Sequence, residues 1–276
     1  MRRPLIPVVF VAALLCGGCS GGSGTAESKA TVKPAAAASP KVVDHAAAIR
    51  AAVAAAQKSS ARIDEEIMMG DGTDTFVVSV KGDFDWAGNR GRLAVDLSSP
   101  EDPGKKSPRL DEIFHGGTVY MGGFPELKGS WMSVRQDRAE AHYLLRAPAN
   151  DPRHVLEQVA QIRGVSDRAH VLLNGIYAYH YQGTLSWETL KLRMTKDMRA
   201  KIDSMPEEIA HIPVRAHVWV AESGRLLRTQ LDWRTGAPGA AMATMTLTDH
   251  GKAVRVSAPP AEDVVPMPSV GGPLTG

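Results

Sequence analysis

The sequence has little of several things that particular classes of protein need. Only two of its 276 residues are cysteines, Cys16 and Cys19, so the body of the chain can form no disulfide. Aromatic residues make up 5% of the total, and the formal net charge is only +2. Nucleic-acid binding needs a concentrated basic surface or stacking aromatic rings, so this composition argues against that class.

Motifs of known catalytic chemistry are also missing. Beyond residue 43 the chain has no G-x-S-x-G nucleophile elbow, and nowhere does it have an S-x-x-K motif or a glycine loop for phosphate. Its nine histidines are scattered, and none belongs to an H-E-x-x-H motif. We therefore predict that the protein is not an enzyme and that it uses no cofactor or metal.

Two groups of polar residues could nevertheless be sites. His217 lies in a strongly patterned strand, but no partner pattern surrounds it, which favours a polar residue on the less buried face. Asp64, Glu65 and Glu66 could bind a cation, yet they lack the alternating oxygen-ligand spacing of a calcium loop. We predict a solvated strand edge or turn at these three acids.

The N-terminus carries the most specific signal in the chain. Arg2 and Arg3 precede an apolar run from Leu5 to Leu15, and small residues then lead to Cys19. A basic end, a short apolar core and small residues at the cut describe a secretory signal. Because a small residue followed by cysteine resembles the bacterial lipobox, we predict a signal peptide over residues 1–18 and lipidation of Cys19.

The chain after Cys19 is rich in Ser, Gly, Ala and Pro and lacks apolar periodicity, so we predict a flexible tether over residues 19–43. Cys16 and Cys19 are also formally a C-x-x-C pair. Their place at the end of an apolar leader, with no βαβ context, argues against a redox or zinc role.

Alternation of apolar and polar residues predicts β-hairpins along the body of the chain. The clearest joins Val214–Ala221 to Leu227–Trp233 through a turn that contains Gly224. A second joins residues 75–86 to 93–97. A third turns at Asn174-Gly175, a dipeptide that strongly favours a two-residue hairpin turn.

Helices are predicted between these hairpins. Asp44 can cap a helix from Ala46 to Gln57, and Asp151-Pro152 is a typical helix start. Ser186 can cap a third helix that extends to Ile202. The order of elements predicts an α+β fold, in which a few helices lie on one side of a single antiparallel sheet.

The third predicted helix has an apolar stripe that repeats every four residues, formed by Leu190, Met194, Met198 and Ile202. Such stripes are typical of ordinary packing of a helix on a sheet. Methionine also adapts to irregular apolar partners, which favours a helix that covers a deformable apolar cavity. Both interpretations remain open at this stage.

Dispersed segments of the chain make it similar to a known family. They are the lipobox-like Cys19 with its tether, Val119-Tyr120-Met121, Trp131-Met132-Ser133-Val134, Asn174-Gly175 with His180–Thr184, Pro213–Leu226, and Leu247–Pro260. With these segments the sequence from Ile49 to Val265 resembles the actinobacterial LppX/LprG-type lipoproteins, which belong with the LolA/LolB-like carriers.

This resemblance implies a strongly curved antiparallel half-barrel over residues 44–265, followed by an irregular tail over 266–276. Helices would lie on its concave side and enclose an apolar cavity for a lipid or other acylated ligand. The side chains that we expect to line this cavity are Leu190, Met194, Met198, Ile202, Val218, Val220, Phe76 and Val78.

The expected function is therefore that of a lipoprotein on the outer face of the cytoplasmic membrane. It would be held there by its lipid anchor, and it would bind and could carry a lipid. The alternative is an extracytoplasmic docking module that engages a membrane-protein partner and has no lipid cargo.

Overall fold

The structure is a computed structural model that describes residues 44–70, 75–99, 108–210, 212–234 and 240–276. The predicted signal peptide, Cys19 and the tether lie outside these residues. The strands are β1 (Ser60–Gly70), β2 (Thr75–Asp85), β3 (Arg90–Ser98), β4 (Arg109–His115), β5 (Thr118–Gly122), β6 (Trp131–Arg135), β7 (Arg163–Leu173), β8 (Ile176–Leu185), β9 (Val214–Ala221), β10 (Leu226–Trp233), β11 (Ala240–Thr248) and β12 (Val264–Pro266). The helices are α1 (His45–Ala56), α2 (Pro152–Val159), α3 (Trp187–Leu190), α4 (Lys196–Asp203) and α5 (Glu207–Ala210), with 3₁₀ turns η1 (Pro125–Leu127), η2 (Pro148–Asn150) and η3 (Ala261–Asp263).

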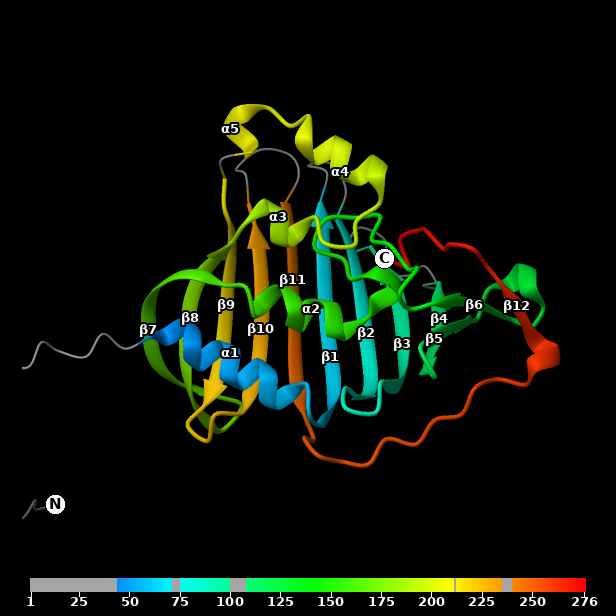
Figure 1. The fold of residues 1–276 in the computed structure, drawn as a ribbon, viewed down its shortest axis with the longest axis horizontal. Helices are drawn as coiled ribbons and strands as arrows, with labels where there is room; N and C mark the ends of the chain where they lie inside the picture. Colours follow the sequence, from blue (N-terminus) through cyan, green and yellow to red (C-terminus); the bar gives the residue numbers. More distant parts are fainter. Residues whose placement is uncertain (1–43, 71–74, 100–107, 211, 235–239) are drawn as a thin grey trace, which may run out of the picture. The chain divides into compact units, whose positions relative to one another are not determined.

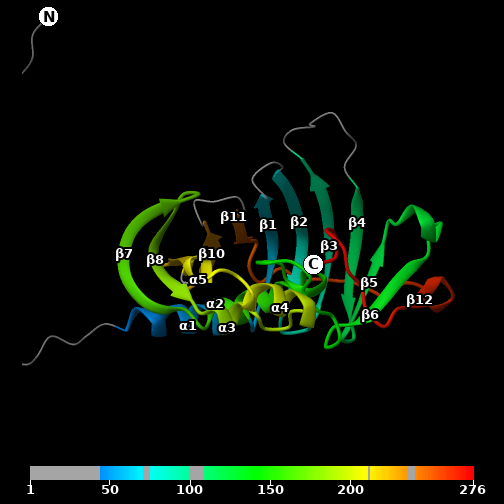
Figure 2. The same ribbon diagram turned by 90° about the horizontal axis from the view of Figure 1, so that it is seen from above.

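All the strands belong to one sheet, in the order β12-β6-β5-β4-β3-β2-β1-β11-β10-β9-β8-β7. Neighbouring strands are antiparallel, apart from β12, which lies parallel to β6. In the described residues the edge strands β12 and β7 pair with β6 and β8 and not with each other, so the sheet is not closed. Figure 2 shows the sheet arching over the helices, with β7 and β8 curling round at one end. The predicted curved half-barrel is confirmed.

The three predicted hairpins are present as β2–β3, β7–β8 and β9–β10. The turn between β7 and β8 has Asn174 at φ 49° and Gly175 at φ 80°. Two successive positive φ values describe a tight hairpin turn of the kind that Asn-Gly adopts readily. This turn sets the register in which Leu173 faces Ile176 and Leu172 faces Tyr177.

Helices α1 and α2 lie across one face of the sheet, which we call the inner face (Figure 1). The carboxylate of Asp44 accepts a hydrogen bond from the Ala47 N–H at 2.9 Å and caps α1 as predicted. Asp151 caps α2 by accepting from the Arg153 N–H at 3.0 Å. Both starts follow from the same physics, because a capping oxygen satisfies an otherwise unpaired N–H of the first turn.

The core lies between these helices and the inner face. In β1, Ile63 and Ile67 are buried while Arg62 and Glu66 are exposed, which is the alternation of a strand with one covered face. Opposite the strands, Ile49 and Val53 of α1 are buried in the same apolar cluster. The face of the sheet away from the helices, which we call the outer face, carries the exposed side chains of β1 and, on β8 to β10, a small apolar cluster of Ala178, Ala221 and Leu227.

The C-terminal residues pack into the inner layer. Val270 and Thr275 are buried. The His142 N–H donates to the Gly276 carbonyl at 3.0 Å, and the Asn150 side chain donates to the Leu274 carbonyl at 2.8 Å. The stretch after Pro266 is irregular, and it covers part of the inner face together with residues 136–151.

Candidate functional site

The segment from residue 186 to residue 210, which we call the cover segment, is not the single helix that was predicted from Ser186 to Ile202. It consists of three short helices, α3, α4 and α5. The predicted cap is present, since the Ser186 hydroxyl accepts from the Thr189 N–H at 3.3 Å. The expected stripe with a four-residue repeat is therefore wrong as a continuous helical face.

The helix is broken because the chain between α3 and α4 pairs with another loop. The Ala141 N–H donates to the Arg193 carbonyl at 2.8 Å, and the Thr195 N–H donates to the Ala141 carbonyl at 3.0 Å. Arg193 takes a positive φ of 55° to make this turn. Thr195 then starts α4 by accepting from the Met198 N–H at 3.2 Å. A threonine cap and a bridged loop thus override helix propensity at this point.

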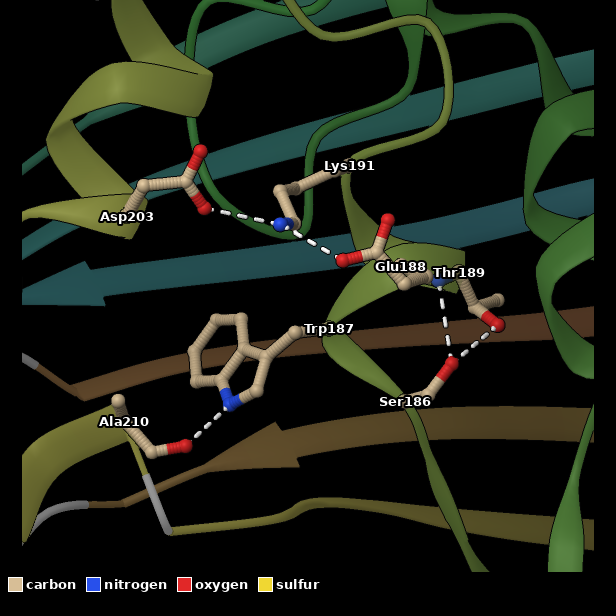
Figure 3. Close-up of polar contacts among 7 residues, drawn as sticks. All are labelled: Ser186, Trp187, Glu188, Thr189, Lys191, Asp203 and Ala210. Atoms are coloured by element: carbon tan, nitrogen blue, oxygen red, sulfur yellow. Dashed lines mark hydrogen bonds and ion pairs between the residues drawn. The ribbon is translucent and has the colours of Figure 1, made fainter. Parts of the chain in front are cut away.

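A few polar contacts hold the cover segment together (Figure 3). The Lys191 ammonium lies 2.8 Å from Glu188 and 2.9 Å from Asp203, which ties α3 to α4. The Trp187 indole N–H donates to the Ala210 carbonyl at 2.6 Å and so ties α3 to α5. Hydrogen bonds to Asp203 and then Glu188 raise the pKa of Lys191. Because both carboxylates are largely exposed, each ion pair contributes no more than about 1 kcal/mol.

Six of the eight expected cavity residues are buried in one apolar cluster on the inner face. They are Leu190, Met194, Ile202, Val218, Val220 and Val78. The structure therefore brings side chains from the cover segment into the same cluster as strands β2 and β9. These residues fill the space between the cover and the sheet as a packed core, and a role in holding a ligand stays a prediction.

The other two expected residues are not among the buried members of this cluster. Met198 is partly buried and packs against the cluster from α4, whereas Phe76 is 42% exposed at the start of β2. Further half-buried residues of the cover, Met205 and Ile209, also pack against the cluster. We call Phe76, Met198, Met205 and Ile209 the apolar margin. Figure 1 places α4 toward the end of the sheet where β1 stops and β2 begins.

A buried polar cluster that was not predicted from the sequence lies within the inner layer. It consists of Glu65 on β1, Glu112 on β4, Arg146 and Asn150, all with 2% or less of their surface exposed. The Asn150 amide donates to Glu112 at 2.7 Å, and Arg146 donates to the Asn150 side-chain oxygen. Among the described residues, Glu112 Oε2 and Arg146 Nε and Nη1 have no hydrogen-bond partner.

Burial dominates the ionisation of this cluster. It raises the pKa of Glu112 to about 8 and that of Glu65 to about 7, although the charge of Arg146 opposes both shifts. Burial lowers the pKa of Arg146, and the two glutamates oppose that shift. A buried carboxylate is costly unless it is fully paired, so Glu112 favours its protonated form at pH 7 and Glu65 is about half protonated there.

The acidic run 64–66 is therefore not the solvated edge or turn that was predicted. It lies in β1, a central strand, and its members alternate between the two faces of the sheet. Asp64 faces Lys81 on the outer face at 3.4 Å, while Glu65 points into the core. One signal was present in the sequence, because Glu65 has the same strand parity as Ile63 and Ile67.

The outer face has a groove of about 740 Å³ with a polar lining. Its walls include Arg62, Asp64 and Arg228 from the sheet and Asn174 from the β7–β8 turn. His217 lies on the same face, as predicted, half-buried and 3.1 Å from a ring nitrogen of His180. Burial, followed by the charge of His180, lowers the pKa of His217. This polar groove does not offer the apolar surroundings that an acyl chain needs.

Within the described ranges, no group of three or more His, Cys, Asp or Glu residues is placed to hold a metal ion. The helices of the same ranges include none that is long and apolar enough to cross a membrane.

No protein-family model and no curated protein matches the chain. Among solved structures, it is similar to LprF from Mycobacterium bovis, with 13% identity, coverage of 78% of this chain and 96% of that one, and a TM-score of 0.43. It is also similar to a LolA-superfamily protein from Nitrosomonas europaea, with 11% identity, coverage of 77% and 94%, and a TM-score of 0.30. At these identities and TM-scores the likeness carries no information on a ligand or an activity. Both are inferred from the residues of this chain.

Proposed function

We propose that the protein is an exported lipoprotein, anchored through Cys19 on the outer face of the cytoplasmic membrane, that binds a lipid or other acylated ligand beneath the cover segment. The observation that carries the proposal is the apolar margin. There Met198, Met205 and Ile209 pack only partly against the core, and Phe76 leaves 42% of its surface exposed. An exposed apolar edge that continues into a core is a natural point of entry for an acyl chain.

The way in which the cover is held supports the same proposal. Its polar ties are exposed ion pairs of Lys191 and one indole hydrogen bond, so polar contacts add little free energy against a displacement of α4 and α5. The main cost of such a displacement is the apolar packing of Ile202 and the half-buried residues around it. Each methylene of an acyl chain that leaves water contributes about 0.8 kcal/mol. About ten methylenes could therefore offset both the displacement of the cover and the entropy cost of binding.

A titration with cis-parinaric acid, a fatty acid that becomes fluorescent in apolar surroundings, tests the ligand proposal. We expect the wild-type protein to bind the probe and Phe76→Ser to bind it at least severalfold more weakly. Val265→Ser is a matched control, because Val265 is also exposed by 45% but lies on the edge strand β12. If no variant binds the probe, the docking module without lipid cargo becomes the better account.

The anchor has its own test. Replacing Cys19 by serine should release the protein from the membrane fraction, whereas Cys16→Ser should leave it membrane-bound. Retention of the Cys19→Ser protein would contradict a lipid anchor at that residue.

A further inference from the structure

The tip of the β7–β8 hairpin is apolar on both of its faces. Leu172 and Tyr177 are opposite each other, and Leu173 and Ile176 form the next pair towards the turn. The exposed fractions are 61% for Leu172, 58% for Tyr177 and 36% for Ile176, so these side chains meet solvent. In a strand pair, successive pairs point to opposite faces, and the turn is therefore ringed by apolar groups.

Such a tip is unusual for a protein surface. The neighbouring β9–β10 turn carries the polar residues Glu222, Ser223 and Arg225. Large apolar side chains that stand together in water mark a place of contact with another apolar phase. Tyrosine, with an apolar ring and a polar hydroxyl, is typical of the boundary between a bilayer and water.

The tip is held in a fixed shape by its surroundings. The Tyr177 ring stacks on the His170 ring at a centroid distance of 5.3 Å, and His170 lies 3.0 Å from the Glu222 carboxylate. The Glu222 N–H donates to the Tyr177 carbonyl at 3.3 Å. Little conformational entropy is lost when an ordered tip enters another phase, which favours insertion.

We propose that this hairpin tip inserts into the interfacial region of the membrane to which the protein is anchored. The inference rests on the proposed anchor at Cys19. The described chain starts at Asp44, 25 residues after Cys19, and α1 then packs against β7. A random-coil chain, as predicted for the tether, would span about 25–30 Å at this length, by 5–6 Å times the square root of the number of residues. The anchor thus keeps the β7–β8 edge of the sheet within reach of the bilayer.

The charges around the tip define the kind of membrane that it fits. Glu222 and Arg225 on the adjoining turn have opposite sign, and His170 pairs with Glu222. Asn174 also lines the outer groove, where the basic Arg62, Lys81 and Arg228 stand beside the acidic Asp64 and Glu66. Acidic partners thus balance the basic groups near the tip, whereas a surface that binds anionic lipid needs an excess of basic groups. Insertion is therefore driven by apolar contact, and it should not require anionic lipids.

A fluorescent label at the turn tests the proposal with the full lipidated protein. Once the leader is removed and Cys19 carries lipid, Asn174→Cys provides the single free thiol for an environment-sensitive dye such as NBD. A matched label at Lys196→Cys reports from α4, beyond the opposite end of β8. In phosphatidylcholine vesicles we expect a blue shift and quenching by brominated lipid at position 174 and neither at 196. Adding phosphatidylglycerol should leave both signals unchanged.

The apolar residues should be responsible for this insertion. Leu172→Asp combined with Tyr177→Ser should lower the inserted fraction at position 174 at least tenfold, equivalent to about 1.4 kcal/mol. The two labels on the otherwise unchanged protein decide the question even if this double variant does not fold. Equal signals at positions 174 and 196 would overturn the proposal.

Two other results would also overturn it. A signal at position 174 that needs anionic lipid would assign the tip to electrostatic binding. A signal that appears without vesicles and grows with protein concentration would assign the tip to a second copy of the chain. Labelling of two thiols in the Asn174→Cys protein would instead reveal an unmodified Cys19, which is a failure of the proposed anchor.

Discussion

Replacement of Glu112 by glutamine should change how the stability of the protein depends on pH. Glutamine keeps the oxygen that accepts from Asn150 at 2.7 Å, but it cannot ionise. The Glu112 side chain is fully buried, and burial raises its pKa from the ordinary value of 4.5 to about 8. The folded protein therefore holds a proton on this group over a range of pH in which the unfolded chain has lost it.

The sign of the effect follows from this difference in bound protons. A group whose pKa is raised by folding contributes stability that is fully present below pH 4.5 and is lost as the pH rises through about 8. At about 1.36 kcal/mol per pKa unit, the wild-type protein should lose about 3 kcal/mol through Glu112 between pH 5 and pH 8. Glu65, with a pKa of about 7, adds a loss of the same sign.

Urea denaturation followed by tryptophan fluorescence at pH 5, 6, 7 and 8 measures this effect. The free energy of unfolding of Glu112→Gln should rise relative to wild type by about 3 kcal/mol from pH 5 to pH 8. Burial lowers the pKa of His154 to about 4, which gives stability the opposite dependence on pH. Because both proteins contain His154, this contribution cancels when their free energies of unfolding are compared at each pH. Glu188→Gln, at a side chain that is 84% exposed, serves as the surface control, and it should change the free energy of unfolding by less than about 1 kcal/mol. A difference between Glu112→Gln and wild type that stays constant with pH would refute the reasoning.

Three further predictions concern the cover segment, and each is measured by urea denaturation at pH 7. Leu190→Ala should cost about 2–5 kcal/mol, because Leu190 is fully buried; a cost below 1 kcal/mol would mean that the cover is not packed on the sheet. Met194→Trp should cost about 1–3 kcal/mol by overpacking a residue with 2% exposure, and an unchanged stability would reveal spare volume beside it. Lys191→Gln should cost less than about 1 kcal/mol, because its two carboxylate partners are exposed; a larger loss would show that these ion pairs do hold the cover.

Local patterns were enough to predict the sheet. The alternation in residues 75–97 and 214–233 gave correct hairpins, and Asn174-Gly175 gave a correct turn. Strand alternation and turn chemistry are properties of a few neighbouring residues, so a sequence displays them directly. The capped starts of α1 and α2 were predictable for the same reason.

Features that depend on distant parts of the chain were not predictable in this way. The third helix is broken because Arg193 and Thr195 pair with Ala141, about fifty residues earlier in the chain. Glu65 and Glu112 are buried near Arg146, and Asn150 binds Glu112, although both partners come from a distant part of the chain. Helical stripes and charged strand positions have the same local appearance whether or not such partners exist. The expected cavity residues illustrate this, since six of them share one cluster although the helix proposed to align them is interrupted.

Native mass spectrometry of the gently purified protein tests the central claim most directly. We predict that the lipidated protein carries an additional acyl-containing molecule, which leaves on denaturation while the mass of the anchor stays. The Cys19→Ser protein should retain the same additional mass without the anchor, and Phe76→Ser should reduce its occupancy. A native mass equal to the polypeptide plus its anchor, with no dissociable lipid, would contradict a ligand beneath the cover segment.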